Sequence, residues 1–272
     1  LSHKSPILKE GVFSGELYDA NLEIKGWNES TNLNLNNWEK VTVLNQWPTK
    51  QLEPQMLPPI KAVKEVKPVE VFNPEPKVWV FDFGQNFTGI PTVDIKKLGL
   101  KKGQAIYFRY AEWVNSKNQI SQKSGGGAPL LKQVDGYIAS GDDAPSLDSI
   151  TAHLVRSNVE IVGQFKSSDP LVNKVHDMAL WGYESNLMAL PMDCPIRERA
   201  GWTGDAHAAL ITGNYNYNMD KFWDKYLGDF QTSAHIAPAV VPGKRSHGGK
   251  LDWAAAEIMI AWEHYRHHGN EQ

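Results

Sequence analysis

The sequence has little cysteine, no long apolar run and no large excess of either charge. Its single cysteine, Cys194, cannot form a disulfide within the chain, so the redox compartment is left open. The 28 Lys and Arg nearly balance the 31 Asp and Glu, and a formal net charge of −3 gives no strong attraction to nucleic acid or an anionic membrane. The sequence contains no run of about 18 apolar residues, so no transmembrane helix is expected. We therefore expect neither nucleic acid nor membrane as a partner.

The first part of the chain has the pattern of β-strands. Residues 1–59 suggest short strands between turns and end in a Pro-rich connection. Residues 60–166 are rich in aromatic and β-branched residues between regularly spaced turns, which is typical of a β-sandwich. The expected strands include 17–25, 39–44, 78–83, 90–97, 104–112 and two more within 149–165. The Gly-rich residues 124–129 lack the Lys-Ser/Thr and the strand-to-helix setting of a phosphate-binding loop, so we expect a flexible linker there.

The pattern changes from strands to helices after Phe165. Ser168-Asp169-Pro170 is a helix start, with a capping side chain followed by Pro at the first helical position. An apolar stripe at helical spacing then predicts a helix to about Leu190. Further helices are expected over 203–217, 219–232 and 252–268. We therefore divide the chain into the end of a β domain (1–59), a β-sandwich domain (60–166) and a helical domain (167–272).

Residues 191–205 form the most unusual stretch, Pro-Met-Asp-Cys-Pro-Ile-Arg-Glu-Arg-Ala-Gly-Trp-Thr-Gly-Asp. Two Pro and two Gly between helix-patterned segments predict a shaped loop rather than a helix. The loop holds three carboxylates among two arginines: Asp193, Glu198 and Asp205 with Arg197 and Arg199. Loops positioned by rigid helices often carry functional residues. A solvated loop whose charges pair at random would have the same composition.

Several of these motifs resemble those of the bacterial α-L-rhamnosidases, six-hairpin glycosidases that remove terminal L-rhamnose. Asp-Cys-Pro at 193–195, Arg-Glu-Arg at 197–199 and Gly-Trp-Thr-Gly-Asp at 201–205 resemble the acidic signature of that family. Val-Phe-Asp-Phe-Gly-Gln-Asn at 80–86 resembles its β-domain signature. The resemblance covers about Tyr18 to Gly269. It implies β-sandwich domains followed by the first helices of an (α/α)6 barrel. Separately, we expect no cofactor.

The resemblance also implies roles for single residues. Glu198 is the implied general acid of an inverting site. The implied sugar-binding residues are Asp193, Arg197, Trp202, Asp205, Asp252 and Trp253, with Asp252 near a position where the family often has Trp-Gly-Asp. The second catalytic carboxylate of the family, a Glu, would lie beyond Gln272. The expected substrate is a rhamnose-containing glycoside or polysaccharide, and a periplasmic or secreted location is favoured over the cytoplasm.

Each of these residues also has a purely structural interpretation. Asp193 could form a local turn, and Asp205 could cap a helix. Trp202 and Trp253 could be core residues as readily as sugar platforms. Cys194 is expected to be a small packed residue, because no pattern around it would activate a thiol.

Histidines gather near the end of the last expected helix. His264, His267 and His268 lie beside Glu263 at spacings that could present two imidazoles to a metal ion. There is no His-Glu-x-x-His pattern, and His suits a helix C-terminus electrostatically. We therefore predict no metal site.

The main hypothesis is an α-L-rhamnosidase-like glycoside hydrolase that carries the acid half of its active site. By itself the chain is expected to be inactive. One alternative is a carbohydrate-binding protein without catalysis. Another is a six-hairpin glycosidase with a different sugar specificity.

Overall fold

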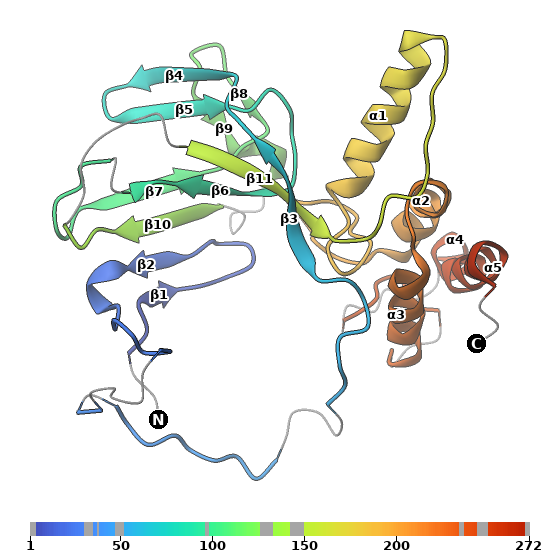
Figure 1. The fold of residues 1–272 in the computed structure, drawn as a ribbon, viewed down its shortest axis with the longest axis horizontal. Coiled ribbons are helices and arrows are strands. Elements are labelled where there is room, and N and C mark those ends of the chain that lie inside the picture. Colours follow the sequence, from blue (N-terminus) through green and yellow to red (C-terminus); the bar gives the residue numbers. More distant parts are fainter. Residues whose placement is uncertain are drawn as a thin grey trace. The chain divides into compact units, whose positions relative to one another are not determined.

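The computed structural model describes residues 4–29, 35–36, 38–46, 52–95, 98–125, 133–141, 150–233, 237–243 and 250–269 (Figure 1). The chain divides into two compact units, which are described separately. One comprises Leu1–Pro54, Val71–Phe81 and Val93–Ile150, and the other Gln55–Glu70, Asp82–Thr92 and Thr151–Gln272. None of the helices in the described ranges is both long and apolar enough to cross a membrane.

The first unit is built of small β-sheets. Its four-stranded sheet has the order β1-β2-β10-β7, in which β10 runs parallel to β2 and antiparallel to β7. Side chains of β7 alternate between exposed and half-buried, as the alternating sequence predicts. The strands of this sheet are β1 (Ile7–Lys9), β2 (Leu17–Asp19), β7 (Ala105–Arg109) and β10 (Val134–Ile138). Two hairpins pair β4 (Glu70–Glu75) with β5 (Val78–Asp82), and β8 (Trp113–Val114) with β9 (Ile120–Ser121).

Some sequence predictions for this unit were wrong. Residues 39–44 form no strand, and only Glu39 makes an isolated bridge. The predicted strand 17–25 is cut short, because β2 is followed by the 3-10 helix η1 (Ala20–Leu22). Of the Gly-rich stretch, 126–129 lie outside the described residues, and the residues before them belong to the 3-10 helix η3 (Gln122–Gly125). The sequence missed β10, whose Gly136 lies where a Cβ would meet the Leu17 side chain at 2.7 Å.

The second unit combines a three-stranded sheet with all the described α-helices. The sheet has the order β3-β11-β6, formed by β3 (Ile60–Val66), β11 (Ile150–Ser157) and β6 (Gly89–Val93). β11 is one long strand where two short ones were predicted. The helices are α1 (Pro170–Glu184), α2 (Thr203–Asn216), α3 (Asp220–Gln231), α4 (Leu251–Ala254) and α5 (Ala256–His268). The predicted succession of a β-rich region and a helical region is confirmed.

The start of α1 follows the sequence signals, but its end does not. The Asp169 carboxylate accepts a hydrogen bond from the Leu171 N–H at 2.8 Å, and Pro170 is the first helical residue. α1 ends at Glu184, before the predicted Leu190. Pro191 disfavours helical geometry at Leu190, and Ala189 has a positive φ of 59°.

The last predicted helix is divided in two. α4 ends at Ala254, and α5 begins at Ala256 after the single connecting residue Ala255. Gly269 then ends α5 in the left-handed conformation with φ 68°, as its position predicts.

The helical core of this unit centres on α3. Trp223 and Tyr226 are fully buried, and aromatic rings pack along the same helix. The wider cluster draws on α2, α5 and the intervening loops: Val159, Leu187, Ala206, Leu210, Tyr217, Met219, Phe222, Phe230, Val241, Ala256 and Ile260. α1 differs because none of its residues is buried, although its apolar stripe was predicted from the same periodicity.

A buried ion pair ties α1 to the sheet of the same unit. The Arg156 guanidinium, on β11, lies 2.9 Å from the Glu184 carboxylate at the end of α1. It also donates to the carbonyls of Ser157 and Val159 and lies over the Tyr217 ring. Ion pairs of this kind hold geometry because removal of either partner leaves a buried charge. The end of α1, a few residues before the 191–205 loop, is therefore fixed.

Candidate functional site

The loop at 191–205 is closed by hydrogen bonds between its two sides. The Asp193 N–H donates to the Ala200 carbonyl at 3.0 Å, and the Ala200 N–H donates to Asp193 Oδ1 at 3.0 Å. Within this ring, the Glu198 N–H donates to Cys194 Sγ at 3.2 Å. Arg199 Nε donates to the Pro195 carbonyl at 2.9 Å. Asp193 therefore does have a structural role, but its hydrogen bonds close the segment 193–200 rather than a local turn.

The end of the loop is locked against the helical core. A Cβ on Gly201 would stand 1.8 Å from the Val241 carbonyl oxygen, so only glycine permits this approach. The Tyr226 hydroxyl donates to the Gly201 carbonyl at 3.2 Å. Thr203, which begins α2, donates its hydroxyl to the Ala239 carbonyl at 3.2 Å. These contacts set where α2 begins and thus where its first-turn carboxylate lies.

A cleft of about 440 Å³ opens between α1, α2 and the start of the loop. Two of the predicted sugar-binding residues, Asp193 and Asp205, line it. The rest of its wall is mostly apolar: Met178, Ala179, Gly182, Tyr183, Asn186, Leu187, Pro191, Met192, Ala208, Ala209 and Thr212. An apolar pocket with a few convergent polar groups is the usual form of a small-molecule site.

The two carboxylates of the cleft repel each other. Partial burial is the main cause that raises the pKa of Asp205, and the negative charge of Asp193 raises it further. Glu198 adds a smaller repulsion, which the backbone hydrogen bond of Asp205 and the nearby His207 oppose. The structural interpretation of Asp205 as a helix N-cap is wrong. Trp202 occupies the N-cap position of α2, and Asp205 lies in the first turn.

Glu198 lies beside the cleft rather than in its wall. Its carboxylate is 30% exposed and stands 3.3 Å from the Arg197 guanidinium, which is 57% exposed. Glu198 thus forms an ion pair with Arg197. Its negative charge also acts on Asp205 in the cleft.

The two tryptophans of the predicted site share a cation. Lys250 Nζ lies 5.9 Å from the Trp202 ring centre and 4.9 Å from that of Trp253. The Trp253 ring packs on Gly204, where a Cβ would stand 2.3 Å from it. Asp252 is exposed in the first turn of α4.

The structure thus brings some predicted residues together and leaves others apart. Asp193 and Asp205 line one cleft. Glu198 and Arg197 form a pair beside it, and Trp202 and Trp253 share Lys250. Asp252 is not among the described residues that line the cleft. The sequence did not point to the α1 wall of the cleft. It did not point to Lys250 either, whose only signal was its position two residues before Asp252.

Three family models match the chain in succession. The α-L-rhamnosidase N-terminal domain matches residues 1–64, the bacterial α-L-rhamnosidase concanavalin-like domain matches 72–164, and the bacterial α-L-rhamnosidase 6 hairpin glycosidase domain matches 160–272. Together the three models match most of the chain, and the last of them is a six-hairpin glycosidase domain. The chain belongs to the bacterial α-L-rhamnosidase family.

Individual relatives agree with this family. An α-L-rhamnosidase of Formosa agariphila is 30% identical over 98% of this chain. The structure of an α-L-rhamnosidase from Dictyoglumus thermophilum is 32% identical and superposes on 95% of the chain with a TM-score of 0.86. That of the Streptomyces avermitilis α-L-rhamnosidase complexed with L-rhamnose is 26% identical over 98% of the chain, with a TM-score of 0.88. The chain spans 32%, 32% and 28% of these proteins, respectively.

Proposed function

We propose that the chain supplies the sugar-binding and acid half of an inverting α-L-rhamnosidase active site. The observation that carries the proposal is the cleft in which Asp193 and Asp205 stand together, with Glu198 beside them. Carboxylates that share a site despite their repulsion are typical of functional sites. The names of the relatives support rhamnose as the sugar.

The proposed chemistry gives each polar residue a task. The Asp193 and Asp205 carboxylates accept hydrogen bonds from sugar hydroxyls, and Arg197 donates to the sugar. Glu198 protonates the leaving oxygen, while a second carboxylate roughly 6.5–9.5 Å away activates water on the opposite face. By the family resemblance, that second carboxylate is a Glu beyond Gln272.

The ion pair with Arg197 bears directly on the role of Glu198. In the structure Glu198 is paired with Arg197, whereas a general acid must be free to reach the leaving oxygen. The Arg197 guanidinium is 57% exposed, so it has room to turn from Glu198 toward a sugar hydroxyl. In this proposal, substrate binding itself frees Glu198 to act as an acid.

The proposed substrates are glycosides or polysaccharides that end in L-rhamnose. Polymers of this kind do not pass intact through a membrane, which supports a periplasmic or secreted location. Neither nucleic acid nor membrane has a part in the proposed reaction. Trp202 and Trp253 would offer aromatic faces to the sugar ring or its methyl group.

One observation favours the alternative of sugar binding without catalysis. Asp193 and Asp205 line the cleft, but Glu198 does not and is bound to Arg197. A protein that recognised rhamnose through the first two carboxylates would need no proton donor. A six-hairpin glycosidase of different sugar specificity would use the same residues with another sugar in the cleft.

The test separates binding from chemistry. L-Rhamnose and D-glucose are titrated calorimetrically into the chain, and an aryl α-L-rhamnoside is assayed with a polypeptide extended to the length of the relatives. Glu198→Gln should lower kcat by roughly 10²–10⁴ and leave rhamnose affinity nearly unchanged. Asp205→Asn should weaken rhamnose binding. Asp177→Asn, at a site whose side chain is 82% exposed on α1, is the control.

The outcomes distinguish the hypotheses. Near wild-type turnover by Glu198→Gln would exclude Glu198 as the acid. Selective rhamnose binding without turnover in the extended polypeptide would favour the carbohydrate-binding alternative. Preference for the other sugar would favour a different glycosidase specificity.

A further inference from the structure

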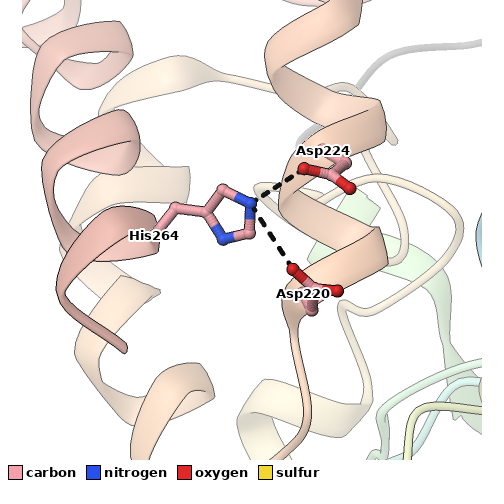
Figure 2. Close-up of side chains that lie close together, drawn as sticks. All are labelled: Asp220, Asp224 and His264. Carbon is pink, nitrogen blue, oxygen red and sulfur yellow. Dashed lines mark hydrogen bonds and ion pairs between the residues drawn. The ribbon is translucent and has the colours of Figure 1, made fainter. Parts of the chain in front are cut away.

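Outside the cleft, three side chains with metal-binding atoms converge between α3 and α5 (Figure 2). His264 Nε2 lies 2.9 Å from Asp224 Oδ1 and 3.8 Å from Asp220 Oδ1. One potential ligand atom from each of the three residues lies within 4.8 Å of the others. The two aspartates are four residues apart on α3, so they share one face of that helix, and the imidazole of α5 points between them.

This arrangement was not visible in the sequence. The histidine cluster considered there included Glu263, but the Glu263 carboxylate binds Arg266 at 2.7 Å and His267 at 3.5 Å. His264 turns instead to aspartates some forty residues earlier in the chain. Its side chain is only 4% exposed, whereas those of Asp220 and Asp224 are 34% and 23% exposed. The cluster therefore has a buried nitrogen and an open carboxylate side.

The remaining carboxylate oxygens are already oriented by a lysine. Lys221 Nζ lies 2.9 Å from Asp224 Oδ2 and 3.5 Å from Asp220 Oδ2. With their Oδ2 atoms toward Lys221, both carboxylates have their Oδ1 atoms on the side of His264. Groups that orient metal ligands from outside are a normal part of metal sites.

A second imidazole provides an independent observation. His268 is four residues after His264 on α5, and the two ring centres are 5.2 Å apart. Its Nε2 is buried and has no hydrogen-bond partner among the described residues. A buried nitrogen without a partner is costly, and a neutral imidazole is the form that binds metals.

We propose that Asp220, Asp224 and His264 bind a divalent transition-metal ion, with zinc as the expected occupant and His268 as the residue that could complete the site. Zinc holds nitrogen and oxygen ligands at about 2.0–2.2 Å, so its ligand atoms lie roughly 3–4 Å from one another. The distances of 2.9 and 3.8 Å around His264 Nε2 match that spacing. Imidazole with carboxylates suits zinc, whereas magnesium and calcium favour oxygen ligands alone. The ion would replace the direct His264–Asp224 hydrogen bond and link α3 to α5.

The experiment measures metal binding by the purified chain and does not depend on its proposed activity. After treatment with EDTA and its removal, zinc chloride is titrated calorimetrically, and cobalt chloride is added in parallel to record its visible absorption. We expect one zinc ion per chain and cobalt bands typical of nitrogen and oxygen ligands. Asp220→Asn and His264→Gln should each weaken zinc binding at least about tenfold. Asp229→Asn is the matched control, because Asp229 lies on the same helix and pairs with Lys225.

Because His264 is buried, circular dichroism first checks whether its variant is folded. If it is not, Asp220→Asn, whose side chain is more exposed, decides the outcome. Absence of stoichiometric zinc binding would overturn the proposal. So would equal binding by wild type, Asp220→Asn and folded His264→Gln, because the zinc would then be held by other residues.

Discussion

Two groups of carboxylates in the helical unit are built with opposite electrostatics. In the cleft, Asp193 and Glu198 both raise the pKa of Asp205, whose partial burial is the largest cause. On α3, Lys221 and His264 lower the pKa of Asp224 in spite of its burial. Each group includes a carboxylate in the first turn of a helix, where the helix dipole favours negative charge. Their difference lies in the neighbours that the tertiary structure supplies.

The comparison suggests what each group is suited for. Like charges held together oppose folding and are retained where a ligand relieves them, which fits the proposed sugar site. Charges compensated by a lysine and a buried histidine stabilise the contact between α3 and α5 even without a ligand. A group of the first kind should lose stability as its charges form, and one of the second kind should gain it.

The largest stability effect is expected from Asp224→Ala. This change removes the 2.9 Å partner of the buried His264 and one of the two carboxylates bound to Lys221. We expect a loss of about 1–3 kcal/mol in the free energy of unfolding, because a buried polar group loses its partner. Urea denaturation in the presence of EDTA measures it. Asp177→Ala, on the exposed surface of α1, should change the same quantity by less than about 0.5 kcal/mol. Equal effects at the two positions would contradict the comparison.

The next effect is the pH dependence of Asp205→Asn. A raised folded-state pKa means that the folded chain binds this proton more tightly than the unfolded chain does. The contribution of Asp205 to stability is therefore fully present below its ordinary pKa of about 3.9 and is lost as pH rises through the folded value. The Asn variant lacks this loss. Its stability relative to wild type should rise by about 0.5–1 kcal/mol between pH 3 and 7, a modest value because the exposed carboxylate is screened.

The same measurement on Asp224→Asn should give the opposite slope. Its folded-state pKa is lowered, so the contribution of Asp224 is present above the ordinary value and is lost as pH falls through the folded one. The disadvantage of this variant should therefore grow as pH rises. Slopes of the same sign for the two variants would show that the two groups do not differ as described.

The sequence predicted helix and strand positions better than it predicted which residues contact one another in the folded chain. Local signals identified the start of α1 at Asp169-Pro170 and the end of α5 at Gly269, because capping depends on adjacent residues. The same local reasoning overextended α1, although Pro191 was available as a signal for an earlier end. It also could not show that the apolar residues of α1 stay exposed, with Leu171 at 67% and Val175 at 59%, because burial depends on what packs against a helix.

The candidate site shows the same limit. Motif spacing brought Asp193, Glu198 and Asp205 to attention, and the family resemblance proposed their roles. The sequence did not show that Arg197 pairs with Glu198, that Asp193 closes the loop through Ala200, or that Lys250 lies over both tryptophans. His264 and Asp224 are forty residues apart. Contacts of this kind follow from how helices pack, which no local pattern encodes.

The smallest stability effect is expected from Arg197→Gln, at the edge of the cleft group. The guanidinium is 57% exposed and the Glu198 carboxylate is 30% exposed, so water screens their attraction. Exposed pairs of this kind contribute about 0–1 kcal/mol, and we expect less than about 0.5 kcal/mol here by urea denaturation.

The same variant should have a much larger effect on sugar binding. A hydrogen bond from a charged donor contributes about 1.5–3 kcal/mol, so loss of the proposed Arg197–sugar contact should weaken L-rhamnose binding at least about tenfold. Calorimetric titration of L-rhamnose measures this effect. Arg266→Gln, which removes a similarly exposed arginine paired with Glu263 on α5, is the control for a general effect of charge. Unchanged rhamnose affinity in Arg197→Gln would mean that Arg197 serves only to pair with Glu198. The Arg197–Glu198 pair would then persist when sugar is bound, and the proposed general acid would have to be sought elsewhere.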